Sequence, residues 1–284
     1  QPPDSRFIND GIRLLEELNA ITGSNDKPHL TKLGRLLATF PVDPRLSRMI
    51  LSAIDLGCIE QVCIIVSGLT IQDVRERPHE KQQAADEQHN RFKNKHSDFI
   101  SLYNLWLYIK QQQAALTNNQ FRKLCKKEFL SFNRVQEWQD IFNQLKLALK
   151  DNNIVMSRLD INLTADDNST DYDLIHQAIL SGLLGQVGQL AEQREFNGPR
   201  GSTFYIFPGS GIAKKAPKWI MAAELVETSR LFARTAAKID PLWIEPMAGH
   251  LIKRHYSEPH WEKKQGAVMA FEQVTLYGLV IVSK

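Results

Sequence analysis

The sequence predicts a multidomain α+β protein with three parts: a small helix-and-hairpin unit, a helical bundle and a small β-barrel. Apolar residues recur at helical spacing through most of the first 184 residues. Near residue 185 the period changes to two, and turn-forming residues separate the short apolar runs that follow. We therefore place the parts at 1–42, 43–184 and 185–250, with the start of an extension at 251–284.

The first part combines two predicted helices with a short hairpin. Residues 5–18 carry apolar side chains at helical spacing, and the Gly-Ser-Asn-Asp-Lys-Pro sequence at 23–28 is typical of a turn between two strands. Thr31 is a suitable N-cap for a second helix. Two helices around a two-stranded wing form a winged-helix pattern, which often binds DNA through its second helix. Because that helix offers only Lys32 and Arg35, the pattern favours docking against other protein.

The second part is predicted to be a bundle of amphipathic helices. Asp43 and Pro44 suit the N-cap and first position of a helix. Further helices are predicted at 98–113 and 134–150, where aromatic and aliphatic residues fall on one stripe. Such stripes must bury against each other, so we interpret the aromatic rings as core residues and not as a cofactor site. The polar residues 151–170 predict a linker, and a further helix follows it.

The third part is predicted to be a barrel of short strands. The strand candidates are 186–192, 202–207, 219–226, 230–239 and 268–282. Residues 197–201, Asn-Gly-Pro-Arg-Gly, predict the turn between the first two candidates. About five short strands within roughly a hundred residues are what a small, partly open barrel requires.

The composition excludes several classes of protein. A hydrophobic content of 43% and a charged content of 24% exclude a mainly disordered chain. The three cysteines form no metal-like or redox pair, so a reducing cytoplasm is expected. Polar residues and glycines interrupt the longest uncharged run, 174–191, so we expect no membrane span. The chain begins with Gln1 and is expected to be part of a longer protein, and to be monomeric.

No catalytic motif is recognisable in the sequence. It lacks a G-x-x-x-x-G-K-[ST] loop, an H-E-x-x-H sequence and a G-x-S-x-G sequence. The eight histidines form no helical pair with an intervening carboxylate, so no metal site is expected. Glu224 and Glu227 resemble an acid/base pair only in spacing, because on a strand they would face opposite sides. We therefore expect no catalytic residues, cofactor or ATP hydrolysis in this chain.

Clustered positive charge suggests an anionic partner. The net charge is only +3, but residues 122–127 hold four basic side chains and residues 198–223 hold four with no acid. On the strand candidate at 230–239, alternation places Arg230, Phe232, Arg234, Ala236 and Lys238 on one face. Positive side chains follow a phosphate backbone, and a ring offers a base a stacking surface. The alternatives are solvated charged faces and, for Phe232, a ring inside the barrel core.

Several sequence strings resemble the DEAH-box RNA helicases. They are LTKLGRLLATFPVDPRLSRMIL at 30–51, LTIQDVRERPHEKQ at 69–82, FRKLCKKEFLSFNRVQEWQD at 121–140 and STFYIFPGSGIAKKAPKW at 202–219. The first resembles the junction of winged helix and helical bundle, the next two the ratchet-like bundle, and the last the OB-fold. The string HYSEPHWEKKQGAVMAFEQVTLYGL at 255–279 looks like the segment after the OB-fold in the bacterial HrpA-type members.

The resemblance implies an accessory region that binds and guides single-stranded RNA and docks on a RecA-like motor core, where ATP and Mg²⁺ would act. Gly209 departs from the serine of many members, which questions one hydroxyl contact to the backbone. The alternative is a platform for a protein or a ribosome, without a direct grip on RNA. The candidate RNA-binding residues are Arg77, Arg122, Lys126, Arg134, Ser210, Lys214, Lys215, Lys218, Arg230, Phe232 and Arg234.

Overall fold

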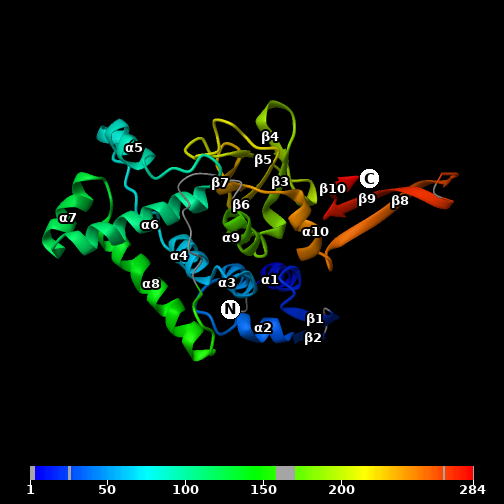
Figure 1. The fold of residues 1–284 in the computed structure, drawn as a ribbon, viewed down its shortest axis with the longest axis horizontal. Coiled ribbons are helices and arrows are strands. Elements are labelled where there is room, and N and C mark those ends of the chain that lie inside the picture. The colour runs from blue at the N-terminus through cyan, green and yellow to red at the C-terminus, as the bar shows by residue number, and fades with distance from the viewer. Residues whose placement is uncertain (1–3, 25–26, 158–169, 265, 284) are drawn as a thin grey trace.

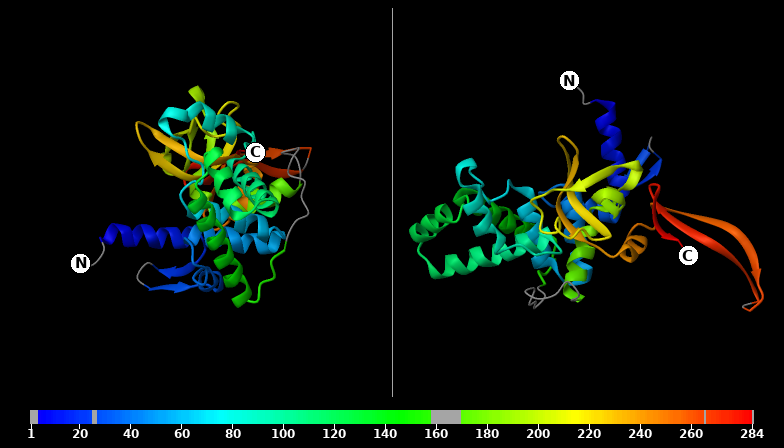
Figure 2. Two further views of the ribbon diagram at one scale, coloured as in Figure 1. Left: turned by 90° about the vertical axis from the view of Figure 1, so that its left-hand side faces the viewer. Right: turned by 90° about the horizontal axis from the view of Figure 1, so that it is seen from above.

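The computed structural model describes residues 4–24, 27–157, 170–264 and 266–283, and it shows the predicted α+β architecture (Figure 1). A winged-helix unit and a closed barrel both lie against the helical bundle. A long two-stranded arm projects from the barrel's end of the molecule, away from α7 and α8 (Figure 2). The predicted linker at 151–170 falls mostly outside the described residues.

The winged-helix unit is built by local capping and one close backbone contact. Its elements are α1 (Ser5–Glu17), β1 (Ile21–Ser24), β2 (Lys27–Leu30) and α2 (Lys32–Leu37). The Thr31 hydroxyl accepts a hydrogen bond from the Gly34 amide at 2.9 Å, as its predicted N-cap role requires. A Cβ on Gly34 would lie only 1.9 Å from the Ala20 carbonyl oxygen, so glycine lets α2 approach the hairpin.

The helical bundle buries its aromatic stripes, as predicted. Its helices are α3 (Pro44–Leu56), α4 (Ile59–Thr70), α5 (Gln82–Asn90), α6 (Asp98–Ala115), α7 (Asn118–Lys127), α8 (Phe132–Asp151) and α9 (Thr170–Leu180). Trp138 of α8 is fully buried, and its ring lies 5.2 Å from that of Trp106. The Trp138 Nε1 donates to the Ile64 carbonyl and to the Ser67 hydroxyl, each at 3.0 Å, so α4 satisfies its only polar atom.

The barrel closes through a parallel pair of strands that the sequence did not predict. Its strands are β3 (Val187–Leu190), β4 (Glu195–Asn197), β5 (Thr203–Ile206), β6 (Trp219–Glu227) and β7 (Leu231–Lys238), in the order β3-β4-β5-β7-β6. Strands β5 and β7 pair in parallel and close the ring, whereas a partly open barrel was predicted. The prediction that residues 268–282 form a barrel strand is wrong. Positive φ angles at Tyr277 and Gly278 turn the chain and split it into two strands outside the barrel.

The predicted face of β7 is correct for its first half only. Arg234 is exposed and Phe232 is half-buried on the outside, whereas Ala233 between them is fully buried. Thr235 has a φ of 50°, which breaks the alternation. As a result, Ala236 and its neighbour Ala237 are both fully buried, and Ala236 does not share the outer face.

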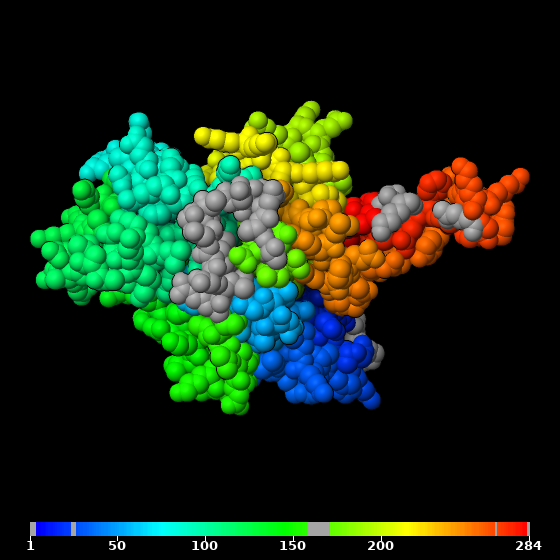
Figure 3. Space-filling view, viewed as in Figure 1, coloured from blue at the N-terminus to red at the C-terminus, as the bar shows by residue number. Residues whose placement is uncertain are grey.

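The arm follows the barrel and consists of β8 (Ile252–Glu262) and β9 (Ala267–Leu276), with β10 (Leu279–Ser283) pairing only with the base of β9. In the space-filling view the arm stands clear of the rest of the protein (Figure 3). Short helices complete the chain: η1 (His79–Lys81), η2 (Leu184–Gln186), η3 (Glu192–Arg194), η4 (Pro199–Gly201), η5 (Pro241–Trp243) and α10 (Ile244–Met247). Within the described ranges, no helix combines the length and apolarity needed to cross a membrane.

Helix α9 is fixed to the start of α6 through a buried histidine. The His176 Nδ1 donates to the Tyr172 carbonyl at 2.6 Å, so its Nε2 accepts from the Ser97 hydroxyl at 2.7 Å. The ring stacks on Tyr172 with a centroid distance of 3.7 Å. Burial lowers the pKa of His176 to about 3, against a small opposing effect of the Tyr172 carbonyl. The imidazole is therefore neutral in the folded protein.

This histidine predicts acid-sensitive stability. Below about pH 6.5 the unfolded state binds a proton that the folded state does not bind, so stability is complete above that pH and falls as the pH drops toward about 3. His176→Gln should remove most of this dependence. Between about pH 7.5 and about pH 5, the free energy of unfolding should fall by about 2 kcal/mol more for the wild type than for the variant. Thermal melts at the two pH values measure this difference.

Exposed His79 provides a matched control, because His79→Gln removes a histidine that is not buried. That control should follow the wild-type pH dependence. An equal loss of stability on acidification in wild type and His176→Gln would contradict the assignment of His176 as the acid-sensitive group.

Candidate nucleic-acid interface

A cleft of about 630 Å³ separates the helical bundle from the barrel, and we call it the bundle–barrel cleft. Its bundle wall is the segment after α4, helix α5 and the start of α6, and its barrel wall is the loop between β5 and β6 together with β7. The polar lining residues are Asp73, Arg75, Arg77, Asp86, His89, Asn90, Lys93, Asp98, Ser210, Lys214, Arg234 and Thr235. A neighbouring hollow of about 560 Å³ shares Asp73, Arg75, Leu102, Arg234 and Thr235 with it. The two hollows therefore lie next to each other.

Two of the arginines in the cleft are neutralised by aspartates. The Arg75 guanidinium contacts the Asp73 carboxylate at 2.7 Å, and Arg77 contacts Asp86 at the same distance. Burial would raise the pKa of Asp73, but the hydrogen bonds and charge of Arg75 outweigh it and lower that pKa. The hydrogen bond from Arg77 is the main cause of the lowered pKa of Asp86. Both carboxylates are therefore ionised at neutral pH, and each fixes its arginine in place.

Three other cations line the cleft. Among the described residues, no ion pair engages Lys93 of the bundle or Lys214 and Arg234 of the barrel, although the charge of Lys93 contributes to the lowered pKa of Asp86. They approach the cleft from both walls, so its two sides present positive charge toward the same space. An arrangement of this kind attracts a polyanion, and its effect falls with added salt.

His89 lines the cleft but has a structural role. Its Nε2 lies 3.2 Å from the Glu128 carbonyl oxygen and 3.1 Å from that of Phe129, so it ties α5 to the end of α7. Burial is the main cause of its lowered pKa. A neutral, anchored imidazole here shapes the wall and adds no charge at neutral pH.

The outer side of the barrel carries a group of rings and arginines beside the cleft. We call Tyr205, Phe207, Arg230, Phe232 and Arg234 the barrel platform. The Phe232 ring lies 6.3 Å from each of the other two rings. The guanidinium of Arg230 lies 4.9 Å from the centre of the Tyr205 ring, and that of Arg234 lies 4.8 Å from the Phe207 ring. Phe232 is therefore on the outer face, and not in the barrel core that the alternative interpretation required.

Ser210 and Asp98 join the two walls of the cleft. Asp98 is the first residue of α6. Its carboxylate accepts hydrogen bonds from the Ser210 hydroxyl and from the backbone amides of Gly211 (2.8 Å) and Ala236 (3.0 Å). All three donors belong to the barrel. The Ser210 hydroxyl is thus engaged by the bundle, and a contact of this hydroxyl with RNA stays a prediction.

The remaining candidate residues are dispersed over the surface. Arg122 and Lys126 of α7 line a separate shallow hollow, where the Arg122 guanidinium lies 4.7 Å from the centre of the Phe132 ring. Arg134 donates to the Asp73 carbonyl at 2.9 Å and so supports the segment that lines the cleft. Lys215 is exposed on the same loop as Lys214. Lys218 lies at a different hollow, beside Tyr172 and Trp243.

Sequence reasoning missed several residues of this interface. Arg75 was not singled out, and its position in both hollows depends on the fold of the segment after α4. Tyr205 and Phe207 join Phe232 only because β5 pairs in parallel with β7, with Tyr205 opposite Phe232. Alternation within the predicted strand at 202–207 would have placed these two rings on one face, but it could not have placed them beside Phe232.

The described residues offer little for catalysis or metal binding. In the ranges that the structure covers, no three His, Cys, Asp or Glu side chains are grouped so that they could hold a metal ion. Burial raises the pKa of Cys58 and of Cys63 to about 12, and that of Cys125 to about 11. These thiols are protonated at neutral pH and are not nucleophiles.

Comparisons with known proteins agree with this architecture. Residues 11–42 match the family described as "Helicase associated domain (HA2), winged-helix" and residues 43–102 the "Helicase associated domain (HA2), ratchet-like". Residues 175–252 match "Oligonucleotide/oligosaccharide-binding (OB)-fold". The fold and these matches define the class: the chain is a helicase-associated region made of a winged helix, a ratchet-like bundle and an OB-fold, as predicted.

Individual relatives narrow this class. The chain is 53% identical, over 100% of its length, to the ATP-dependent RNA helicase HrpA of Escherichia coli (strain K12). It is 51% identical over 99% of its length to the HrpA homolog of Haemophilus influenzae, and 27% identical over 89% to the pre-mRNA-splicing factor ATP-dependent RNA helicase prp22 of Schizosaccharomyces pombe. It spans 21%, 21% and 20% of these proteins. The chain thus matches a region of the HrpA-type RNA helicases that makes up about a fifth of their length.

The joint formed by Asp98 can be tested by changing its charge alone. Asp98→Asn keeps the size of the side chain but replaces one acceptor oxygen by a donor, so at least one barrel donor loses its partner. We expect a loss of about 1.5–3 kcal/mol, because hydrogen bonds to a charged group are worth that much. Urea denaturation followed by tryptophan fluorescence measures the loss, and hydrogen exchange at Gly211 and Ala236 should accelerate.

Asp140→Asn is the matched control, because this exposed aspartate of α8 makes no hydrogen bond or ion pair that the structure describes. It should leave the unfolding midpoint within experimental error. If both variants lose the same free energy, the Asp98 carboxylate is not the joint between bundle and barrel.

Proposed function

We propose that this chain binds and guides single-stranded RNA for an ATP-driven helicase motor. The observation that carries the proposal is the bundle–barrel cleft, where cations on both walls make no ion pair with any residue that the structure describes, and where the barrel platform continues the surface. The chain's relatives are named ATP-dependent RNA helicases, and the proposal extends that activity to the longer protein of which this chain would form a part. ATP and Mg²⁺ would be used by a RecA-like core on which the chain docks, in the cytoplasm.

The chemistry of the cleft suits a backbone that passes through it without regard to sequence. Lys93, Lys214 and Arg234 would contact successive phosphates, since point charges do not distinguish the four bases. The rings of the barrel platform would stack on bases that emerge from the cleft, because every base has a π-face. The interface would therefore hold single strands of any sequence and would favour them over blunt duplex.

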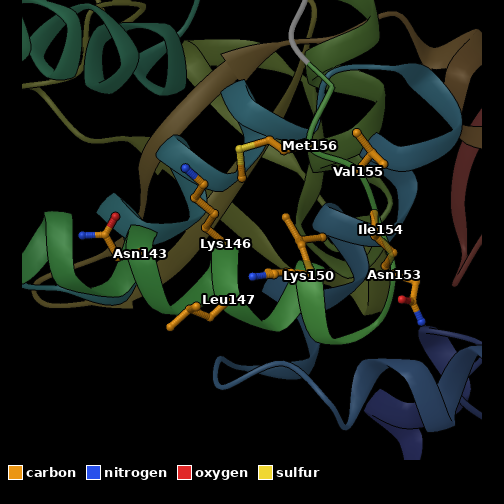
Figure 4. A pocket seen from close by; sticks show the side chains of 9 residues that line it. Asn143, Lys146, Leu147, Lys150, Asn153, Ile154, Val155 and Met156 are labelled. Atoms are coloured by element: carbon orange, nitrogen blue, oxygen red, sulfur yellow. The ribbon is translucent and has the colours of Figure 1, made fainter.

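A second function, docking of another protein, is favoured by one observation. A groove of about 750 Å³ lies at the end of α8 and is lined by Lys146, Leu147 and Lys150 of the helix and by residues 153–156 that follow it (Figure 4). Leu147 is 59% exposed and Val155 is 84% exposed, and none of the groove's lining residues is acidic. An acidic protein or a ribosome-bound segment would fit it. This partner function is compatible with RNA binding and would use a different surface.

Phosphate contacts predict a change in the salt dependence of binding. Lys214→Ala combined with Lys215→Ala should weaken binding to single-stranded RNA equally for all sequences. The slope of log affinity against log salt should fall by roughly one unit for each lost phosphate contact. Fluorescence anisotropy with labelled oligonucleotides at several salt concentrations measures both quantities.

Lys146→Ala combined with Lys150→Ala is the matched control, because it removes the same charge from the groove at the end of α8. RNA affinity and slope should stay near the wild-type values. The proposal fails if the two double variants behave alike, or if the wild type shows no salt-dependent binding to single-stranded RNA.

Stacking predicts a different signature for Phe232. Phe232→Ala should cost about 1–3 kcal/mol of RNA-binding free energy, with little change in salt slope, because a ring carries no charge. Because Phe232 lies on the outer face, its loss should lower the free energy of unfolding by much less than the about 3–5 kcal/mol that loss of a core phenylalanine costs. One thermal melt and one titration measure the two quantities.

Phe7→Ala is the control for this variant, since Phe7 is 73% exposed on α1, far from the barrel platform along the chain. It should leave RNA affinity unchanged. A large melting shift for Phe232→Ala with unchanged affinity per folded molecule would show that the ring stabilises the barrel and does not bind bases.

A further inference from the structure

The arm, β8 and β9, exposes more apolar and aromatic surface than an isolated ribbon is expected to carry. Tyr256 is 60% exposed, Trp261 61%, Val268 66% and Phe271 52%. Two-stranded ribbons are marginally stable in water, and large exposed apolar side chains mark interaction sites. The arm follows the residues that the OB-fold match covers, so none of the family matches assigns it a role.

The two faces of the arm differ in chemistry. Strand pairing places Arg254 opposite Val274 and Tyr256 opposite Glu272, and these residues share the face whose base is buried, as Val274 and Leu276 show. The opposite face is exposed along its length. We call it the outer face of the arm, and its residues include Lys253, His255, His260, Met269 and Phe271.

Acidic side chains are kept away from most of the outer face. Arg254 holds Glu272 (2.8 Å) and Glu245 on the other side of the ribbon. The Glu262 carboxylate at the tip accepts a hydrogen bond from the Lys264 amide at 3.0 Å. Between Lys253 and His260, the outer-face residues paired with β9 carry no negative charge. Glu258 lies in the bulge before His260, and Glu262, Lys263 and Lys264 follow toward the tip. Three lysines therefore outnumber two glutamates along this face and its tip, so its net charge is positive.

Flat rings accompany this positive charge. The rings of His260 and Phe271 lie 6.2 Å apart at an interplanar angle of 41°, and His255 is exposed further along the same face. Exposed rings interleaved with positive and polar side chains are what single-stranded nucleic acids bind, by stacking and by phosphate contact. An apolar protein partner would prefer the opposite face, where Trp261 pairs with Val268.

We propose that the outer face of the arm is a second RNA-binding surface, separate from the bundle–barrel cleft. It takes its ligand, single-stranded RNA, from the proposed function. The cleft lies between the bundle and the barrel, and the arm projects from the barrel's end of the molecule, away from α7 and α8 (Figures 1 and 2), so a strand that contacts both must extend past the barrel. Bases stack on Phe271 and His260, while Lys253 and the tip lysines contact phosphates.

The test compares two RNA lengths on the whole chain. The probes are a labelled single-stranded RNA of about 8 nucleotides, within the site size of one OB-fold, and one of about 30 nucleotides. The double variant Phe271→Ala, His260→Ala removes the two rings of the outer face on which bases are proposed to stack and leaves His255 in place. Trp261→Ala is the matched control, because it removes an equally exposed ring from the other face of the same ribbon.

The double variant should bind the long RNA at least about fivefold more weakly than the wild type, and the short RNA equally well. Trp261→Ala should bind both like the wild type, and circular dichroism should show that all variants fold. Unchanged binding of the long RNA by the double variant would overturn the proposal and leave the arm to a protein partner. An equal loss of affinity for the long RNA in the double variant and in Trp261→Ala would also overturn it, because the binding would then not depend on the outer face in particular.

Failure of the proposed function gives a different result. If the cleft does not bind RNA, Arg234→Ala leaves both affinities unchanged, and only the long RNA responds to the double variant. If the arm alone fails, Arg234→Ala weakens both RNAs and the double variant weakens neither.

Discussion

The carboxylate of Asp98 holds the barrel against the helical bundle, and the cleft between them depends on that joint. It stands at the first position of α6, where the helix dipole favours a negative charge, and it accepts three hydrogen bonds from the barrel. Two of these donors are backbone amides, so the joint fixes the main chain of the β5–β6 loop and of β7. Lys214 and Arg234 extend from these two segments into the cleft. The carboxylate at the start of α6 therefore helps to position Lys214 and Arg234, together with the bridge between Ser97 and Ala237.

Glu17 plays a comparable part where the winged helix meets the barrel. It is the last residue of α1 and is buried, yet its carboxylate accepts from the Gly185 amide (3.0 Å) and from Arg200 (2.9 Å). Arg200 in turn lies 4.0 Å from the centre of the Tyr277 ring at the base of the arm. Winged helix, barrel and arm thus meet at one buried charge. Removing its partner would leave that charge unpaired, which is costly in a buried position.

Local signals in the sequence predicted local structure well. Thr31 and Asp43 act as the N-caps that their residue types indicate, and both buried helical stripes of α6 and α8 were found from spacing alone. The outer position of Arg230 and Arg234 also followed from alternation. Prediction failed where non-local pairing decides: alternation cannot reveal the parallel pairing of β5 with β7, nor the ion pair that commits Arg77 to Asp86. The split at Tyr277 needed a positive φ at a bulky residue, which residue type disfavours.

The distance along the chain between Glu17 and its partners has a consequence for synthesis. Gly185 and Arg200 follow it by 168 and 183 residues. At ordinary rates of translation, a ribosome needs on the order of 10 to 30 seconds to add that many residues. During this interval the Glu17 carboxylate lacks both of these partners. The winged helix can already pack on α3 through α2, but its joint with the barrel can form only after Gly185 and Arg200 have been synthesised.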